Sequence, residues 1–160
     1  MASQRVLDAL NNQLQMEFFS EYFYISMEAY FADNNLDGFA NFFNVQAREE
    51  RDHAYKIFNY IGRAGGKVVL QGIEQPKINF ESPLDVFESA LEHERLISNS
   101  IHDLVDLAIS EKENQYPKAT ALLSSTPYTK GKVIVSKYAL YFIIYVICCI
   151  AYLVEMQFVP

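Results

Sequence analysis

The sequence predicts an all-α protein built as a bundle of long helices. Three stretches, about residues 4–31, 37–62 and 83–108, carry apolar side chains at the spacing of one helical face. A short polar turn at residues 33–35 separates the first two stretches, so we expect those helices to lie side by side and antiparallel. With 160 residues, 51% of them hydrophobic, the chain is expected to form one globular domain with a buried core.

Charge and cysteine content narrow the class of protein. The net charge of −7 argues against nucleic acid as a partner and favours cations. The two cysteines, Cys148 and Cys149, are adjacent and poorly placed to bridge each other, which suits a reducing compartment. The first residues lack a charged segment followed by an apolar one, so no secretory signal is expected and the predicted location is cytoplasmic.

The first predicted helix carries an acid on its core face. Ser3 is expected to cap its N-terminus, and no proline or glycine interrupts residues 4–31. Glu17 stands where a leucine would be expected. The residues of this face are Leu7, Leu10, Leu14, Glu17, Tyr24 and Phe31.

The second predicted helix brings a carboxylate and an imidazole to its apolar face. Glu50 and His53 are three residues apart, so both side chains leave the same side of the helix. A buried carboxylate needs a cation or a hydrogen-bond partner. The pair therefore indicates either a metal site in the bundle or a pair on a solvated shoulder. The face comprises Phe43, Ala47, Glu50, His53, Ala54, Ile57 and Ile61.

The number of residues between each acid and the turn at 33–35 predicts that Glu17 and Glu50 lie at the same height along the bundle axis. Glu17 and Glu50 lie at similar distances along the chain from the turn at residues 33–35, so the antiparallel pair sets them side by side. Residues 65–81 contain Gly72 and Pro76 and show no helical period. In extended form this link spans about 3.3 Å per residue, enough to cross a helix of about 40 Å. The third helix is thus expected to run parallel to the second.

The third predicted helix supplies one more acid. It opens with Ser82 as a cap and Pro83 at its first position. Glu94 is the acid on its apolar stripe and falls at the level of Glu50, whereas His93 points about 100° away and is expected on the surface. Acids from three helices at one height favour the metal site. The stripe is Leu84, Phe87, Leu91, Glu94, Ile97, Ile101, Leu104, Val105 and Ala108.

Taken together, these features resemble those of bacterial non-haem ferritins over roughly residues 4–123. The resemblance implies a ferritin-like four-helix bundle with a long crossover before the third helix. It also implies a hollow shell of 24 subunits that oxidises Fe(II) with O2 or H2O2 at an intrasubunit di-iron centre and stores the ferric product. The features are the crossover, the turn at residues 36–42, Glu17, Tyr24, Glu94 and Glu50-x-x-His53.

The resemblance also implies roles for individual residues. Glu17 and His53 look like ligands of the first iron, Glu50 like the bridging carboxylate and Glu94 like a ligand of the second iron. Hard oxygen ligands with a single imidazole suit iron independently of the resemblance.

Two further roles come from the same resemblance. Tyr24 looks like the tyrosine beside the centre, and Glu49 resembles a ligand of a nearby third iron site. Bacterioferritins and rubrerythrins carry a second Glu-x-x-His motif. Residues 94–97 read Glu-Arg-Leu-Ile, which does not match that motif.

The resemblance ends near residue 123, so residues 1–123 are predicted as the ferritin-like bundle and 124–160 as an atypical apolar tail that alters the fourth helix. No acid occurs between Glu113 and Glu155, and Pro127 and Gly131 disfavour a continuous helix there. Three explanations stay open: a substituted reading frame, a divergent fourth helix, or a C-terminal membrane anchor formed by the uncharged residues 139–154.

The sequence thus predicts an iron-storage ferroxidase that forms a homo-oligomer and has its activity reduced by the altered tail. Two alternatives remain. One is a non-catalytic subunit that co-assembles with an intact paralogue, and the other is a membrane-anchored ferritin-like protein.

Overall fold

The computed structural model describes residues 2–111, and this part of the chain folds into three α-helices. Helix α1 spans Gln4–Asp33, α2 spans Asp37–Arg63 and α3 spans Pro83–Ser110. The all-α prediction is confirmed, and the bounds of α1 and α2 fall within two residues of those expected. The predicted change of the fourth helix and the tail at 124–160 lie outside the described residues.

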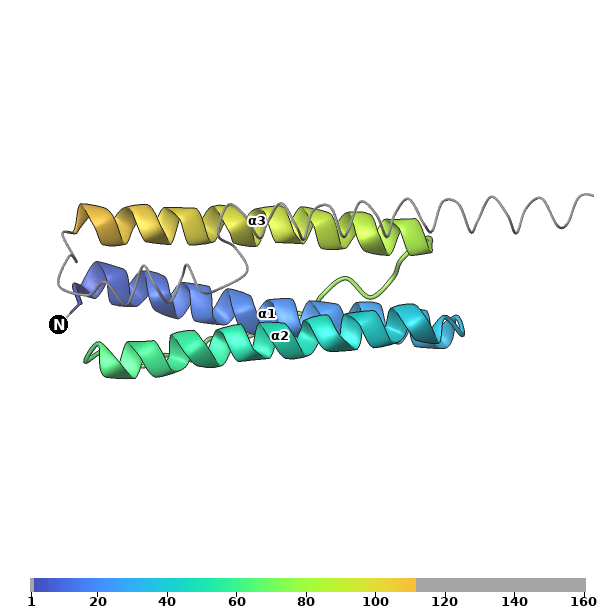
Figure 1. Ribbon diagram of the computed structural model, residues 1–160, viewed down its shortest axis with the longest axis horizontal. Coiled ribbons are helices and arrows are strands. Elements are labelled where there is room, and N and C mark those ends of the chain that lie inside the picture. The colour runs from blue at the N-terminus through green and yellow to red at the C-terminus, as the bar shows by residue number, and fades with distance from the viewer. Residues whose placement is uncertain (1, 112–160) are drawn as a thin grey trace, which may run out of the picture.

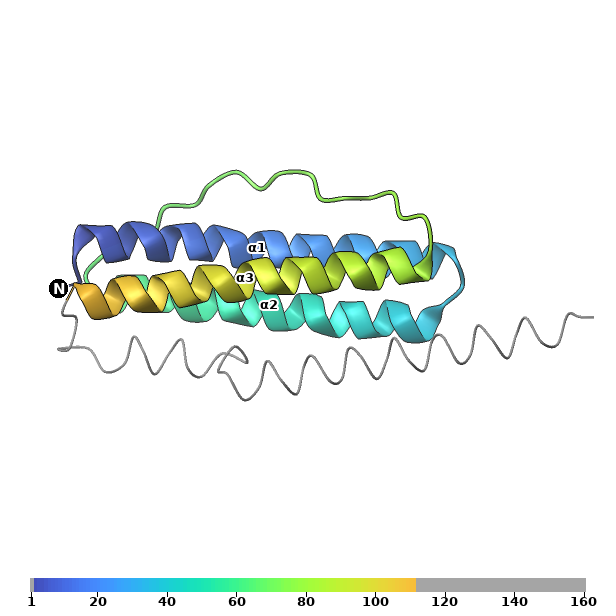
Figure 2. The same cartoon turned by 90° about the horizontal axis from the view of Figure 1, so that it is seen from above.

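The three helices form an elongated bundle. Helices α1 and α2 run antiparallel, and α3 runs in the same direction as α2 (Figure 1). The link between α2 and α3 makes this possible, because it carries the chain back along the length of α1 (Figure 2). The predicted crossover is therefore confirmed. None of the described helices has the length and hydropathy needed to cross a membrane.

The helix ends follow from local chemistry. The Ser3 hydroxyl accepts a hydrogen bond from the backbone N–H of Val6, and the Ser82 hydroxyl accepts one from that of Asp85, so both predicted caps are confirmed. Asn35 adopts φ 56°, in the left-handed region that asparagine tolerates better than most residues. This residue makes the turn between α1 and α2 short enough to keep the helices adjacent.

The core divides into an aromatic end and an aliphatic end. The aromatic end contains Phe23, Tyr24, Phe31, Phe43 and Phe87, together with Met27, Ala47, Val86 and Ala90. The aliphatic end contains Val6, Leu7, Leu10, Leu14, Ala54, Ile57, Tyr60, Ile61 and Leu104, with Ala2 and Ala64. Along α1 and α2 the polar residues Glu17, Glu50 and His53 fall between these two clusters, so apolar side chains flank them on both sides.

Two predictions for α3 are wrong, the burial of Leu84 and the exposure of His93. Leu84 is 43% exposed because it lies in the first turn of α3, at the end of the bundle, whereas Val86 and Ala90 are buried instead. His93, expected on the surface, is only 9% exposed. Its ring packs against Phe19 and Phe23 of α1, which shows that the buried side of α3 is rotated toward α1 relative to the prediction.

Asn11 ties the crossover to α1. Its Nδ2 donates to the carbonyl oxygens of Leu7 and Lys67, at 3.0 and 3.1 Å, and its Oδ1 accepts from the backbone N–H of Val69 at 2.8 Å. Further along, the Ser26 hydroxyl donates to a second crossover carbonyl. An otherwise irregular segment is thereby fixed in register along α1.

We expect Asn11→Ala to lower the free energy of unfolding by about 1–3 kcal/mol, because it leaves a backbone donor and an acceptor of the crossover unpaired. Urea denaturation measures the loss. Asn12→Ala is the matched control, since Asn12 accepts only an exposed side-chain hydrogen bond from Gln71. Equal losses in both variants would contradict the assignment.

Candidate metal centre

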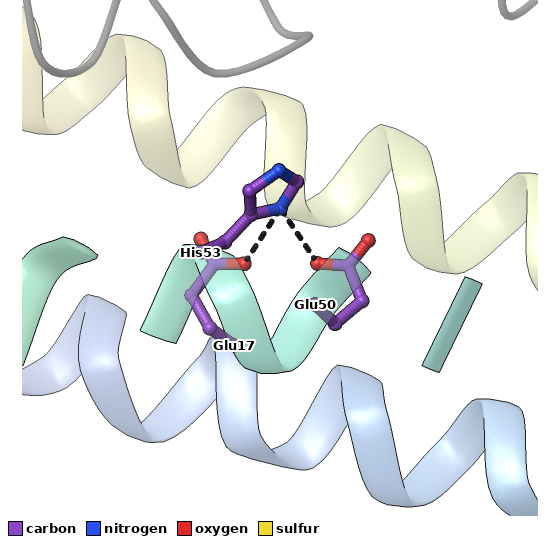
Figure 3. A group of neighbouring side chains, drawn as sticks. All are labelled: Glu17, Glu50 and His53. Carbon is purple, nitrogen blue, oxygen red and sulfur yellow. Dashed lines mark hydrogen bonds and ion pairs between the residues drawn. The ribbon is translucent and has the colours of Figure 1, made fainter. Parts of the chain in front are cut away.

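Glu17 of α1 and Glu50 and His53 of α2 meet inside the bundle (Figure 3). One ligand atom from each residue lies within 4.8 Å of the other two. The helical spacing of Glu50 and His53 brings these two together, and the antiparallel pairing of α1 and α2 adds Glu17 at the same level. The prediction that Glu17 lies at the same height along the bundle as the Glu50–His53 pair is thus confirmed.

The imidazole nitrogen faces both carboxylates. The Nδ1 atom of His53 lies 3.2 Å from Oε2 of Glu50 and 3.9 Å from Oε2 of Glu17 (Figure 3). Glu17 is fully buried, and Glu50 and His53 are each 4% exposed. Three groups able to ligate a cation therefore converge on one point that is shielded from solvent.

Burial disfavours charge on all three groups. It raises the pKa of Glu17 to about 8, with a further rise from the charge of Glu50. It raises the pKa of Glu50 to about 8 as well, with the charge of Glu94 as the next cause, and it lowers the pKa of His53. A neutral imidazole leaves a nitrogen lone pair available. A cation binding here would displace protons from the carboxyl groups.

The two carboxylate oxygens of Glu17 differ in their hydrogen bonding within the described part of the chain. The Oε1 atom of Glu17 accepts a hydrogen bond from Nε2 of Gln13 at 2.8 Å, whereas its Oε2 is buried without a hydrogen-bond partner among residues 2–111. Buried polar atoms are nearly always satisfied, so such an exception needs an explanation. A cation held by this oxygen together with Glu50 and His53 would supply the missing partner, and two oxygens with one nitrogen suit iron.

Glu94 and Tyr24 lie beside the three-residue cluster. The buried Tyr24 donates its hydroxyl hydrogen bond to Oε1 of Glu94, which joins α1 to α3. Glu94 is half-buried and is not part of the tight group, but its charge contributes to the raised pKa of Glu50. The structure therefore brings Glu94 within electrostatic reach of both Glu50 and His53.

Glu49, for which the resemblance to ferritins implied a place at a third iron site, is exposed on α2. The residue accepts a long, exposed hydrogen bond from Gln46 at 3.4 Å. Its charge is among the smaller influences on the pKa values of Glu50 and His53. Glu49 thus borders the centre, and its role as a ligand stays a prediction.

The sequence prediction did not include two buried polar groups, Gln13 at the centre and the His93–Ser20 pair between α1 and α3. Gln13 is 1% exposed and contacts Glu17 directly, and the Nε2 atom of His93 lies 2.8 Å from the hydroxyl of Ser20. Gln13 precedes Glu17 by four residues and shares its helix face, so a polar residue at that spacing was a usable indication. His93 gave no such indication, because its burial depends on how α3 is rotated against α1.

Comparisons with known proteins agree with this geometry. The Ferritin-like domain family matches residues 7–117. The bacterial non-heme ferritin of Staphylococcus epidermidis is 40% identical over 113 residues, which cover 71% of this chain and 68% of that protein. The corresponding protein of Staphylococcus aureus is 38% identical over the same shares.

Solved ferritin structures share the fold. An open-pore ferritin from the archaeon Archaeoglobus fulgidus matches with a TM-score of 0.80 and 36% identity, covering 89% of this chain and 85% of that one. A ferritin from Chlorobium tepidum matches with a TM-score of 0.80 and 31% identity, covering 91% and 85%. With the family match over most of its length and relatives of about 40% identity, the chain belongs to the ferritin family.

Proposed function

We propose that this chain binds Fe(II) at Glu17, Glu50 and His53, oxidises it to Fe(III), and serves in iron storage. Iron storage and ferroxidase activity are the functions that the ferritin family indicates. The observation that supports them most directly in this chain is the buried cluster of two carboxylates and one imidazole, with Oε2 of Glu17 lacking a hydrogen-bond partner among residues 2–111.

The geometry supports different roles for the ligands at two iron positions. Oε2 of Glu17 and Nδ1 of His53 would hold a first iron ion. Glu50 interacts with both His53 and Glu94, since its Oε2 lies 3.2 Å from Nδ1 of His53 and the charge of Glu94 helps to raise its pKa. Such a position fits a carboxylate that bridges to a second iron ion, for which Glu94 would be the next ligand.

Two iron ions held close together can share one oxidant. Each Fe(II) gives up one electron, and one O2 takes up the two electrons with two protons to form H2O2. When H2O2 is the oxidant, it takes two electrons and two protons to form two water molecules. Tyr24, hydrogen-bonded to Glu94, is the proposed catalytic residue beside the centre. Glu49 is proposed to hold iron nearby, at the exposed edge of α2.

Assembly and location complete the proposal. By the resemblance of its bundle to those of ferritins, we expect the chain to form a homo-oligomeric shell, of 24 subunits, in the cytoplasm. The sequence has no acid between Glu113 and Glu155, so Glu50 and Glu94 are the two acids proposed for the second iron position. This observation supports a chain with reduced turnover, or a non-catalytic subunit that enters a mixed shell.

An anaerobic Fe(II) titration followed by a pulse of O2 measures the difference between the two iron positions. We expect one iron ion per chain to bind at least about tenfold more tightly than the second, because the second position has fewer carboxylates, and ferric formation to be slow. Glu50→Ala should abolish both phases, whereas Glu92→Gln, an exposed change on α3, should leave them unaltered. Two equally tight iron ions with fast oxidation would contradict the proposed impairment.

The metal-free chain should be destabilised by Glu17 as the pH rises. The unfolded chain loses this proton near pH 4.5 and the folded chain keeps it to about pH 8, so stability falls across that interval. Glu17→Gln removes the effect, and we expect it to raise the free energy of unfolding by about 3 kcal/mol at pH 7 and by little at pH 4. Urea denaturation with a chelator present measures this.

The control for that measurement is again Glu92→Gln, which removes an exposed charge and should show no pH-dependent gain. A Glu17→Gln chain that is less stable than its parent at pH 7 would contradict the account of Glu17 as an uncompensated buried acid.

A further inference from the structure

We infer that Gln13 and Ser100 are positioning residues for Glu17, holding one carboxylate oxygen so that the other alone faces the metal. This inference rests on the proposed function, since it assumes that Glu17 is a ligand. It assigns α3 a part in the centre that is separate from Glu94, because Ser100 lies on α3 and acts through Gln13 on α1.

The contacts form a continuous chain across two helices. The Ser100 hydroxyl donates to Oε1 of Gln13 at 2.6 Å, and Nε2 of Gln13 donates to Oε1 of Glu17 at 2.8 Å. Gln13 is 1% exposed and Glu17 is fully buried, so water does not compete for the bond between them, whereas Ser100 is half-buried. Hydrogen bonds in such a setting are strong, and leaving one unmade is expensive.

The chemistry of each group fixes the direction of the chain. In the ionised form that binds a metal, the Glu17 carboxylate only accepts hydrogen bonds, so the amide of Gln13 must then turn its NH2 toward Glu17. The carbonyl end then needs a donor, which is the hydroxyl of Ser100. The alternative acceptor for that hydroxyl, Sδ of Met16 at 3.2 Å, is a weaker one. The Gln13 side chain is thereby held in one orientation.

The orientation of Gln13 determines which oxygen Glu17 offers. With Oε1 engaged by the amide, Oε2 is left 3.9 Å from His53 and without a hydrogen-bond partner among the described residues. The carboxylate cannot rotate to exchange its oxygens without breaking the bond to Gln13. We therefore infer that Glu17 binds the metal through Oε2 alone.

The hydrogen-bond partner of Glu17 is the neutral side chain of Gln13, which does not compete with a metal cation for the charge of the carboxylate. One turn further along α1, Glu21 is paired with the guanidinium of Arg51, and that cation satisfies its charge. Gln13 gives Glu17 a hydrogen bond without a positive charge. The negative charge of Glu17 thus stays available for an iron ion.

Binding of Co(II) to the full-length chain, followed by its visible absorption under anaerobic conditions, tests the inference. Gln13→Met keeps the length of the side chain but removes the donor, and we expect Co(II) to bind about tenfold or more weakly. Ser100→Ala should weaken binding about threefold, because the carbonyl oxygen of the Gln13 amide then loses the donor that helps to hold the side chain in place, and Ser100→Thr should restore binding by returning the hydroxyl.

Matched controls separate positioning from folding. Gln15→Met changes the same residue type on α1 at a position that bonds the crossover, and Ser89→Ala removes a half-buried hydroxyl from α3. Both should bind Co(II) as the parent does. In a Glu17→Ala background the effect of Gln13→Met should vanish, whereas a purely structural role would leave it in place.

The Co(II) measurements distinguish failure of the positioning role of Gln13 and Ser100 from failure of the assignment of Glu17 as a ligand. If Glu17→Ala weakens Co(II) binding while Gln13→Met and Ser100→Ala do not, the positioning role is overturned and the ligand assignment stands. If Glu17→Ala binds Co(II) as tightly as the parent, the ligand assignment itself is overturned, and the positioning role with it. Should Gln13→Met not fold, the comparison of Ser100→Ala with Ser100→Thr decides the question.

Discussion

The main physical constraint on this structure is that two carboxyl groups and an imidazole are buried at the contact between α1 and α2. Glu17, Glu50 and His53 are all nearly inaccessible to solvent, and each is less easily charged than in water. In a core built only for stability these positions would carry leucine or alanine. The arrangement becomes favourable once a cation binds, because the cation compensates both acids and gives Oε2 of Glu17 a partner.

The bundle serves to bring these groups to one level. The short turn after α1 places Glu17 opposite Glu50, and the crossover held by Asn11 returns the chain so that α3 runs parallel to α2. α3 then reaches the centre at two points, through Glu94 bonded to Tyr24 and through Ser100 bonded to Gln13. Aromatic packing on one side and aliphatic packing on the other keep water away from the site.

Much of this was predictable because helical periodicity is a strong local rule. The core faces of α1 and α2, the caps at Ser3 and Ser82 and the meeting of Glu17 with Glu50 and His53 all follow from spacing and chain counting. The rotation of α3 was not predictable in the same way, because it depends on how side chains from two helices interlock. This is why His93 was misplaced, whereas Leu84 was misplaced because it lies in the first turn of α3, at the end of the bundle.

The central claim is that the buried cluster is a metal site, and its most direct test is anomalous diffraction from crystals of the full-length chain grown with Fe(II) under anaerobic conditions. The account predicts an iron peak within bonding distance of Oε2 of Glu17, the carboxylate of Glu50 and Nδ1 of His53. Iron bound at surface acids, with no peak within reach of Glu17, would contradict it.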